Sequence, residues 1–179
     1  MESYDKIITG VRKNERHSQM AFYDLFFHPV FQSAFAVTGN HEEAEEIMQD
    51  TLLKVFSNTS LLQEDSGAMS RLLRRMAVNQ AIDTVRKRKD FICSLADDDL
   101  IDVQDEEEEE ECAWTVADIK TGIGKLSPAY RSILSLRLFE EMSFADIARQ
   151  LNMNASTTRV QYGRGILKLR TLLKQQIYE

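Results

Sequence analysis

The hydrophobic pattern of residues 142–170 predicts two helices joined by a short turn. In the first helix, apolar residues recur at i, i+3, i+4 and i+7, the spacing of one buried helix face, and Ser143 precedes them as an N-cap. These apolar residues are Phe144, Ile147, Ala148 and Leu151. Asn152 and Met153 break the pattern, and Asn154 is a suitable cap for the second helix. The residues of that helix expected to face inward are Val160, Leu167 and Leu169.

The other side of the second helix is polar near its N-terminal end. Its candidate DNA-reading residues are Ser156, Thr157, Arg159, Gln161 and Arg164. This layout is typical of a helix-turn-helix, in which the second helix enters the major groove of DNA. Any two helices packed through a tight turn share the same apolar spacing, so the pattern alone leaves both interpretations open.

A strongly amphipathic helix is predicted from Ala44 to Phe56. Its inner stripe consists of Ala44, Ile47, Met48, Thr51, Leu52, Val55 and Phe56. The opposite face carries Glu42, Glu45, Glu46, Gln49 and Asp50, with Leu53 among them. Such a face is either a solvated acidic surface or a docking surface for a basic protein, with Leu53 as its apolar anchor.

The segment before this helix is rich in aromatic residues and is expected to supply much of a small core. Its core candidates are Phe22, Leu25, Phe26, Phe31, Phe35 and Val37. Pro29 lies within the segment, where it is expected either to begin a helix or to kink one.

A further helix is predicted over roughly residues 69–89. Its inner side is formed by Leu72, Leu73, Met76, Ala77, Ala81 and Val85. One outer stripe carries Arg75, Asn79, Asp83 and Arg86. Basic side chains and an asparagine on one exposed face suit contacts to phosphates and to a base edge. The alternative interpretation is ion pairing within the helix, such as Asp83 with Arg86.

The charge distribution divides the chain of 179 residues into three parts. Residues 94–117 hold eleven acidic residues and no basic one, which predicts a flexible acidic linker. Residues 1–93 carry twelve basic and thirteen acidic residues, and residues 118–179 carry ten basic and five acidic ones. The net charge of −7 therefore hides a basic C-terminal domain suited to nucleic acid. With few prolines and no alternating strand pattern, we predict an all-α fold of two small domains, 1–93 and 118–179.

The acidic run is most simply a solvated spacer between the two domains. Its consecutive acids lack the spaced ligands and glycine of a calcium loop. A further hypothesis is that it competes with nucleic acid for the basic domain. Replacing residues 106–111 by serine or glutamine is then expected to tighten non-specific DNA binding at low salt, and unchanged binding would refute the hypothesis.

Several classes of protein are disfavoured by the sequence. No apolar run is long enough to span a membrane and the N-terminal residues are charged, so a cytoplasmic protein is expected. Cys93 and Cys112 have no partner at metal-ligand spacing, and neither a metal nor another cofactor is expected. His17, His28 and His41 stand without a paired nucleophile or phosphate loop, so the sequence does not indicate an enzyme.

Three motifs in order resemble the bacterial RNA polymerase sigma factors of the extracytoplasmic-function (group 4) type. AEEIMQDTLLKVF is similar to the acidic signature of the family's region 2, and RRMAVNQAIDTVRKRK to the basic run that follows it. Residues 123–170 are similar to region 4, from IGKLSPAYRSILSLR through SFADIARQLNMNASTTRVQ. The resemblance covers nearly the whole chain and implies a non-enzymatic factor in transcription initiation.

The resemblance gives each surface a role. It implies that Glu45, Glu46, Gln49, Asp50 and Leu53 dock on the clamp of the polymerase's largest subunit. It implies that Arg75, Asn79, Asp83 and Arg86 capture the melted downstream promoter element. It implies that Ser156, Thr157, Arg159, Gln161 and Arg164 read the upstream element as duplex. It also implies an anti-sigma factor as a partner.

An alternative function is a sigma-like mimic, or a helix-turn-helix regulator that does not itself initiate transcription. Some residues also depart from the family pattern. Thr158 occupies a usually apolar position, where it is expected to bond back to a backbone carbonyl. Gly163 and Gly165 lie inside the predicted recognition helix, where they either allow close approach to DNA or soften the helix.

Overall fold

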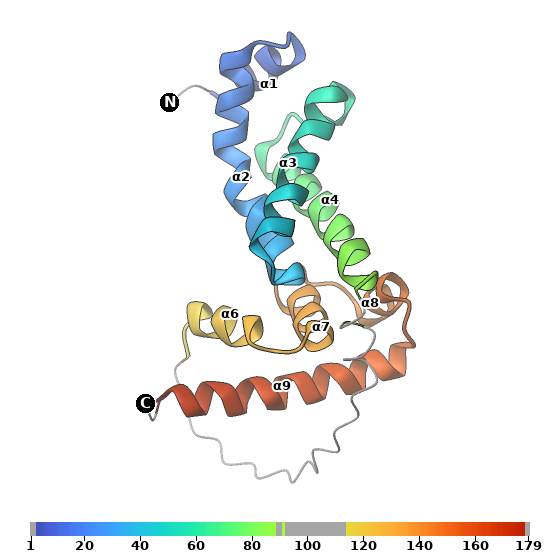
Figure 1. The fold of residues 1–179 in the computed structure, drawn as a ribbon. Helices are drawn as coiled ribbons and strands as arrows, with labels where there is room; N and C mark the ends of the chain where they lie inside the picture. The colour runs from blue at the N-terminus through green and yellow to red at the C-terminus, as the bar shows by residue number, and fades with distance from the viewer. Residues whose placement is uncertain (1–2, 89–90, 92–113, 178–179) are drawn as a thin grey trace. The chain divides into compact units, whose positions relative to one another are not determined.

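The computed structural model describes residues 3–88, 91 and 114–177, and these residues form α-helices and one 3-10 turn. The helices are α1 (Tyr4–Arg12), α2 (Arg16–Thr38), α3 (His41–Ser57), α4 (Ser66–Arg86), α6 (Val116–Gly124), α7 (Pro128–Leu138), α8 (Phe144–Leu151) and α9 (Ala155–Ile177), with the 3-10 turn at Thr59–Leu61 (Figure 1). The predicted all-α fold is confirmed. Cys93, Cys112 and the acidic run at 97–111 lie outside the described residues.

The chain forms two compact units, unit 1 at Met1–Thr84 and unit 2 at Val85–Glu179. The boundary falls near the C-terminal end of α4, somewhat before the end of the predicted first domain at residue 93. The predicted linker, residues 94–117, overlaps the start of α6, because Thr115 caps this helix and Val116 is its first residue. The two units are described separately below.

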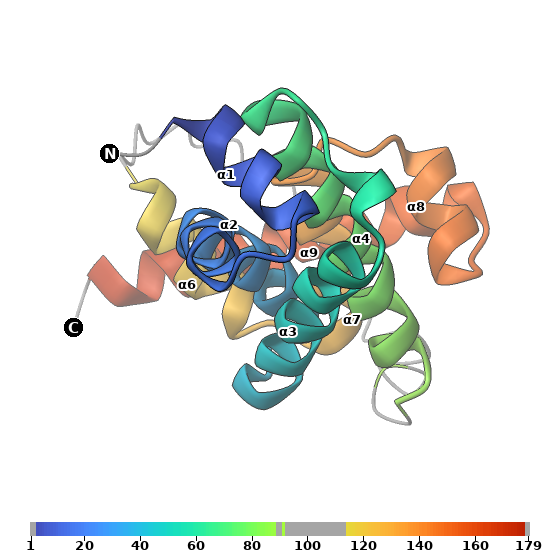
Figure 2. The same ribbon diagram turned by 90° about the horizontal axis from the view of Figure 1, so that it is seen from above.

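Unit 1 is built around α2, which packs against α1 and α3 (Figures 1 and 2). Phe22 of α2 is fully buried, and its ring lies 4.7 Å from that of Phe26 and 5.7 Å from that of Phe56 on α3. The helix α1 was not predicted from the sequence. It buries Ile7, Ile8 and Val11 among charged neighbours.

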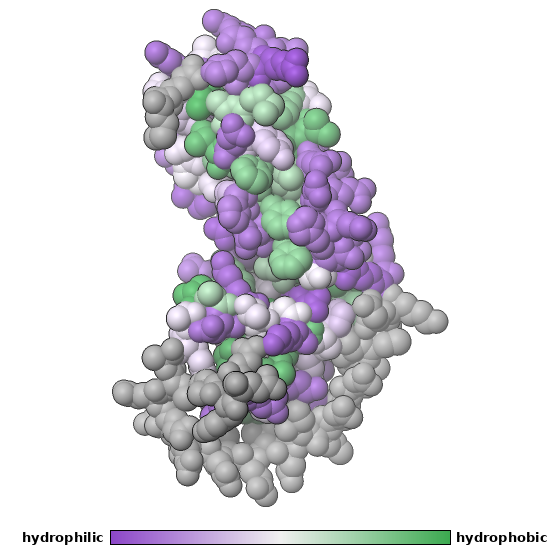
Figure 3. All heavy atoms as spheres, turned by 60° about the vertical axis from the view of Figure 1, so that its left-hand side comes forward, coloured by the Kyte–Doolittle hydropathy of each residue, from purple (hydrophilic) through white to green (hydrophobic). Residues whose placement is uncertain are grey.

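The outer side of α2 differs from the sequence prediction. Leu25 and Phe35, predicted in the core, are exposed, as are Met20 and Phe27. Because α2 has large apolar residues on several sides, around an exposed polar stripe of Asp24, His28 and Gln32, spacing alone could not decide which of them face inward. Figure 3 shows hydrophobic side chains, in green, running along this unit between hydrophilic ones. Pro29 lies in the middle of α2 and does not begin it.

The predicted inner face of α3 is confirmed. Ala44, Ile47, Met48, Thr51, Leu52 and Val55 are buried, and Phe56 is half-buried. Asn40 caps the helix, since its side chain accepts a hydrogen bond from the Glu43 N–H at 3.2 Å. On α4, Leu73, Ala77 and Ala81 are buried as predicted, while Leu72 and Met76 are only half-buried.

Unit 2 is organised by the long helix α9, against which α6, α7 and α8 pack (Figure 1). Its core contains Ile123, Leu126, Tyr130, Leu134, Leu169 and Leu173. Helix α6 begins in a capping box, in which Thr115 and Asp118 each accept a backbone N–H of the other. Hydrogen bonds from the hydroxyl and the backbone N–H of Thr115 hold the pKa of Asp118 below its usual value.

Gly165 lets α9 approach α7 closely. A Cβ atom at this position would lie 2.5 Å from Cδ1 of Leu134 and 3.2 Å from Cδ1 of Tyr130, both of which are buried. A Cβ atom at Gly163 would meet nothing within 4 Å. Packing against α7 therefore accounts for Gly165, and it does not account for Gly163.

We expect Gly165→Ala to destabilise unit 2 by about 1 kcal/mol, because overpacking of about 1–3 kcal/mol exceeds the gain in helix propensity. Gly163→Ala is the matched control, since the same methyl group enters open space. It is expected to stabilise α9 by about 1 kcal/mol. Urea denaturation of both variants measures the difference, and equal midpoints would contradict the packing role of Gly165.

Candidate functional site

The turn between α8 and α9 is built by local hydrogen bonds. Ser143 caps α8, accepting the Asp146 N–H at 3.1 Å as predicted. At the other end of α8, Asn152 adopts a left-handed conformation with φ of 58°, and the Met153 N–H reaches back to the Ala148 carbonyl at 2.8 Å. Asparagine tolerates this conformation better than most residues, so the chain turns within three residues before α9 begins.

The start of α9 is held by Asn154. Its Oδ1 accepts the Ser156 N–H at 2.9 Å and the Ser156 hydroxyl at 2.8 Å, which confirms the predicted cap. The Thr158 hydroxyl donates to the Asn154 carbonyl at 2.9 Å, which confirms the predicted back-bonding. The helix-turn-helix predicted from the sequence is therefore present in the structure.

The candidate DNA-reading residues do not all lie on the outer side of α9. Ser156, Thr157 and Arg159 are exposed and Arg164 is half-buried. Gln161 is 3% exposed, so its prediction as an exposed DNA-reading residue was wrong. Val160, predicted to face inward, is 51% exposed, and that prediction was also wrong.

The register of α9 explains both errors. The buried side is formed by Thr158, Gln161, Gly165, Leu169 and Leu173, at spacings of three and four. The N-terminal part of this buried face consists of two polar residues and a glycine. The apolar spacing therefore predicted Val160 on the buried face instead. Leu169 is buried as predicted and Leu167 is half-buried.

An aromatic ring at the start of α8 gathers two guanidinium groups. The ring of Phe144 lies 4.9 Å from Cζ of Arg137 and 5.8 Å from Cζ of Arg159, and Tyr162 meets it edge-on at 5.2 Å. Arg137 also donates to the Met142 carbonyl at 2.9 Å. Cation–π contacts of this kind order long side chains that would otherwise be mobile.

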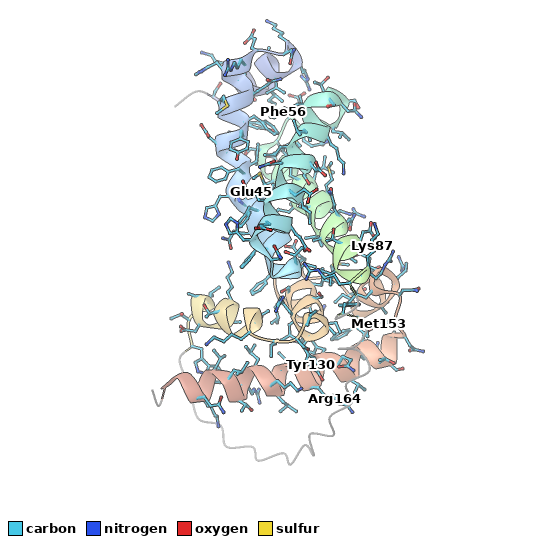
Figure 4. The ribbon with its side chains drawn as sticks, viewed as in Figure 1. Glu45, Phe56, Lys87, Tyr130, Met153 and Arg164 are labelled. Atoms are coloured by element: carbon cyan, nitrogen blue, oxygen red, sulfur yellow. The ribbon has the colours of Figure 1, made fainter. Side chains whose placement is uncertain are left out.

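Arg137 is therefore a candidate DNA-binding residue that the sequence reasoning missed. It lies near the end of α7, outside the helix-turn-helix, and reaches Arg159 only through the ring of Phe144. No sequence spacing indicates a contact between side chains of three different helices. Arg164, another candidate DNA-binding residue, lies further along α9 and is labelled in Figure 4, which also labels Tyr130 on α7, the helix that carries Arg137.

The outer face of α3 is acidic and solvated. Glu45, Glu46 and Gln49 are exposed and Asp50 is half-buried. Gln49 donates to Glu45 at 3.3 Å, and Nδ1 of His41 lies 4.0 Å from Glu45. Leu53 is 58% exposed beside these residues, so an apolar side chain stands among acidic ones; Figure 4 labels Glu45 on this helix.

The stripe predicted on α4 is exposed along its length. Arg75, Asn79, Asp83 and Arg86 all have exposed side chains. Arg74 does not join this stripe, because its Nε donates to the buried Ser33 of α2 at 3.0 Å. Fewer arginine side chains therefore lie on the exposed basic side of α4 than the helix contains.

Gln80 connects the acidic face of α3 to α4. Its Nε2 donates to Asp50 at 2.9 Å, and its Oε1 accepts from Nζ of Lys54 at 2.9 Å. Gln80 directly follows Asn79 in the chain. The two candidate surfaces of unit 1 are therefore joined by side-chain hydrogen bonds, which supports a fixed geometry between them.

The described ranges 3–88, 91 and 114–177 contain no group of three or more His, Cys, Asp or Glu side chains arranged to hold a metal ion. None of their helices is both long and apolar enough to cross a membrane.

Two family models match separate parts of the chain. Residues 22–91 match the family model of sigma-70 region 2, and residues 117–169 match that of sigma-70 region 4. Together the two models cover more than half of the chain. A match to a family model does not assign a role to any single surface residue.

Characterised relatives extend the similarity. An ECF RNA polymerase sigma factor, SigE of Mycolicibacterium smegmatis, is 27% identical over 84% of this chain and 59% of its own length. SigW of Bacillus subtilis, also an ECF RNA polymerase sigma factor, is 26% identical over 94% of this chain and 96% of its own. A solved structure of the sigma factor RpoE with the anti-sigma factor NepR from Bartonella quintana aligns over 87% of this chain and 96% of that one, with 21% identity and a TM-score of 0.49.

Proposed function

Because the chain belongs to the sigma-70 family of RNA polymerase sigma factors, of the extracytoplasmic-function type, and so directs RNA polymerase to promoters, we propose a division of that task among three of its surfaces. Unit 1 docks on core polymerase and captures the melted downstream element, and unit 2 reads the upstream element as duplex. The proposed regions are 1–93 and 118–179, joined by a linker that contains the acidic run at 97–111 and ends before Thr115, the cap of α6.

The docking surface is the acidic face of α3. The exposed Leu53 follows Gln49 and Asp50 by one helical turn and Glu45 and Glu46 by about two, and a basic partner with an apolar pocket would complement them. We assign this partner to the clamp of the polymerase's largest subunit. Acidic side chains at the rim chiefly raise the association rate, while Leu53 supplies the apolar contact.

The downstream surface is the exposed side of α4. Arg75 supplies positive charge for the phosphates of a single strand, and Asn79 can hydrogen-bond a base that has left the duplex. Arg86, the last residue of α4, belongs to unit 2, where it donates to the Gln150 carbonyl at 2.9 Å, and it is kept as a further candidate for a phosphate contact. The bonds from Gln80 to Asp50 and Lys54 support this assignment, since they hold α4 against the docking helix.

The upstream surface is the N-terminal half of α9 with the Phe144 cluster. Ser156, Thr157, Arg159 and Arg164 remain candidates, and Arg137 joins them through Phe144. Gln161 is not proposed again, because it is buried. The observation that carries the proposal is this capped helix-turn-helix, in which the Phe144 ring at the start of α8 contacts the guanidinium groups of Arg137 on α7 and Arg159 on the recognition helix α9.

The chain acts by binding, and we propose an anti-sigma factor as a further partner. Run-off transcription with purified core polymerase and genomic promoters tests the proposal. We expect the full-length protein to support specific initiation. If it binds core polymerase but starts transcription at no promoter, the result would indicate a sigma-like mimic and overturn the proposal.

A further inference from the structure

Two residues on the exposed side of α9 have no packing explanation. Val160 is 51% exposed, and a Cβ atom at Gly163 would meet nothing within 4 Å. Valine loses side-chain freedom in a helix and glycine weakens one, so neither residue favours α9 itself. Gly165, in contrast, is buried against Tyr130 and Leu134. Packing among the described residues therefore does not account for Val160 or Gly163.

Both residues lie on the face that carries the candidate DNA contacts. Ser156, Val160 and Gly163 follow one another at i, i+4 and i+7, and are all exposed. The guanidinium groups of Arg159 and Arg164 come from neighbouring positions of the same helix. The isopropyl group of Val160 and the exposed backbone at Gly163 thus lie in the middle of a polar face.

The major groove offers one apolar group that suits such a position. Thymine carries a 5-methyl group on its groove edge, whereas guanine, cytosine and adenine present hydrogen-bonding atoms there. The valine side chain can contact this methyl group, but it can form a hydrogen bond with none of the polar atoms of the other bases. A G·C pair at the same place would leave its donors or acceptors unsatisfied against the side chain.

We propose that Val160 reads the 5-methyl group of a thymine in the upstream promoter element, and that Gly163 lets the backbone of α9 come close enough for this contact. The inference rests on the proposed function of α9. It assigns base specificity to a residue that cannot form a side-chain hydrogen bond, beside arginines that hold the DNA.

The experiment uses the full-length protein with core polymerase. High-affinity promoters are first selected from a pool with a randomised upstream element. Each thymine of the selected element is then replaced singly by deoxyuridine, which removes only the methyl group, and binding is measured by competition.

For the wild-type protein, we expect one position to lose about fourfold in affinity, the value of one buried methyl group. Val160→Ala is expected to lose about as much on the thymine promoter and to be insensitive to deoxyuridine at that position. Val160→Thr is the matched variant of similar shape: it keeps one methyl group and replaces the other by a hydroxyl, so it is expected to lose less affinity than Val160→Ala and to stay sensitive to deoxyuridine at that position. Gly163→Ala is expected to weaken promoter binding although it stabilises the helix.

The outcomes separate the inference from the proposed function. A wild-type protein that is insensitive to every deoxyuridine, or a Val160→Ala variant with the same sensitive position, would overturn the inference. If Arg159→Ala and Arg164→Ala also bind the promoter like the wild type, α9 does not read duplex DNA and the proposed function fails with it. If these arginine variants bind weakly while the deoxyuridine scan is flat, only the role of Val160 is refuted.

Discussion

Arg159→Ala and Arg164→Ala are each expected to weaken binding of the upstream promoter duplex by about tenfold, because a guanidinium contact to DNA contributes about 1–3 kcal/mol. Arg159, in the first turns of α9, lies over the ring of Phe144 at the start of α8. Replacing Arg159 therefore also removes a charge that this contact orders. Binding of upstream-fork DNA by the holoenzyme at several salt concentrations measures the effect. A variant that loses a phosphate contact should also show a shallower salt dependence.

Two variants serve as controls for this prediction. Lys174→Ala removes the same charge from an exposed position further along α9, and it is expected to change affinity little. Asn79→Ala on α4 is expected to spare duplex binding and to slow open-complex formation, since it belongs to the surface proposed for the melted strand. Equal losses of duplex binding in the Arg159, Arg164 and Asn79 variants would contradict the division of labour between the units.

Leu53→Ala is expected to reduce the affinity for core polymerase by about tenfold, because burying a leucine side chain contributes about 1.5–3 kcal/mol. The side chain is 58% exposed in the free protein, so its truncation should leave unit 1 folded. Titration of labelled protein with core polymerase measures the affinity, and circular dichroism checks the fold.

Leu25→Ala is the matched control for the docking prediction. Leu25 is 46% exposed and lies on α2, whereas the acidic residues of the proposed docking surface lie on α3. The same truncation there should leave core binding unchanged. The assignment of the docking surface to α3 would be wrong if the Leu25 variant lost as much affinity as the Leu53 variant, or if the Leu53 variant lost none.

The acidic residues of the same face are expected to act differently from Leu53. Charges at the rim of an interface mainly affect association rate and salt dependence. Asp50 is an exception in this group, since it accepts a hydrogen bond from Gln80 and is half-buried. Its replacement would disturb the connection to α4 as well as the docking surface.

Sequence periodicity was most informative where a helix had one apolar side. The inner face of α3 and the buried residues of α8 followed directly from their spacing, because a single stripe can face the core in only one way. The caps at Ser143 and Asn154 were equally clear, since their hydrogen bonds join residues within one turn.

Periodicity failed where the buried face was polar or where large apolar residues lay on several sides of the helix. On α9, Thr158, Gln161 and Gly165 take the inner positions, and Val160 is left outside. On α2, Phe35 and Leu25 are as hydrophobic as the buried Phe22 and Phe26, so only the packing of α1 and α3 selects the inner side.

By itself, the sequence determined the all-helical class, the place of the helix-turn-helix and the family, because these depend on local spacing and on residue type. Only the tertiary structure decided that Arg137 joins Arg159 across Phe144, that Gln80 connects α3 to α4, and that Gly165 is a packing residue. These facts depend on contacts between residues far apart in the chain. Local propensity contains no information about such contacts, which arise when helices pack.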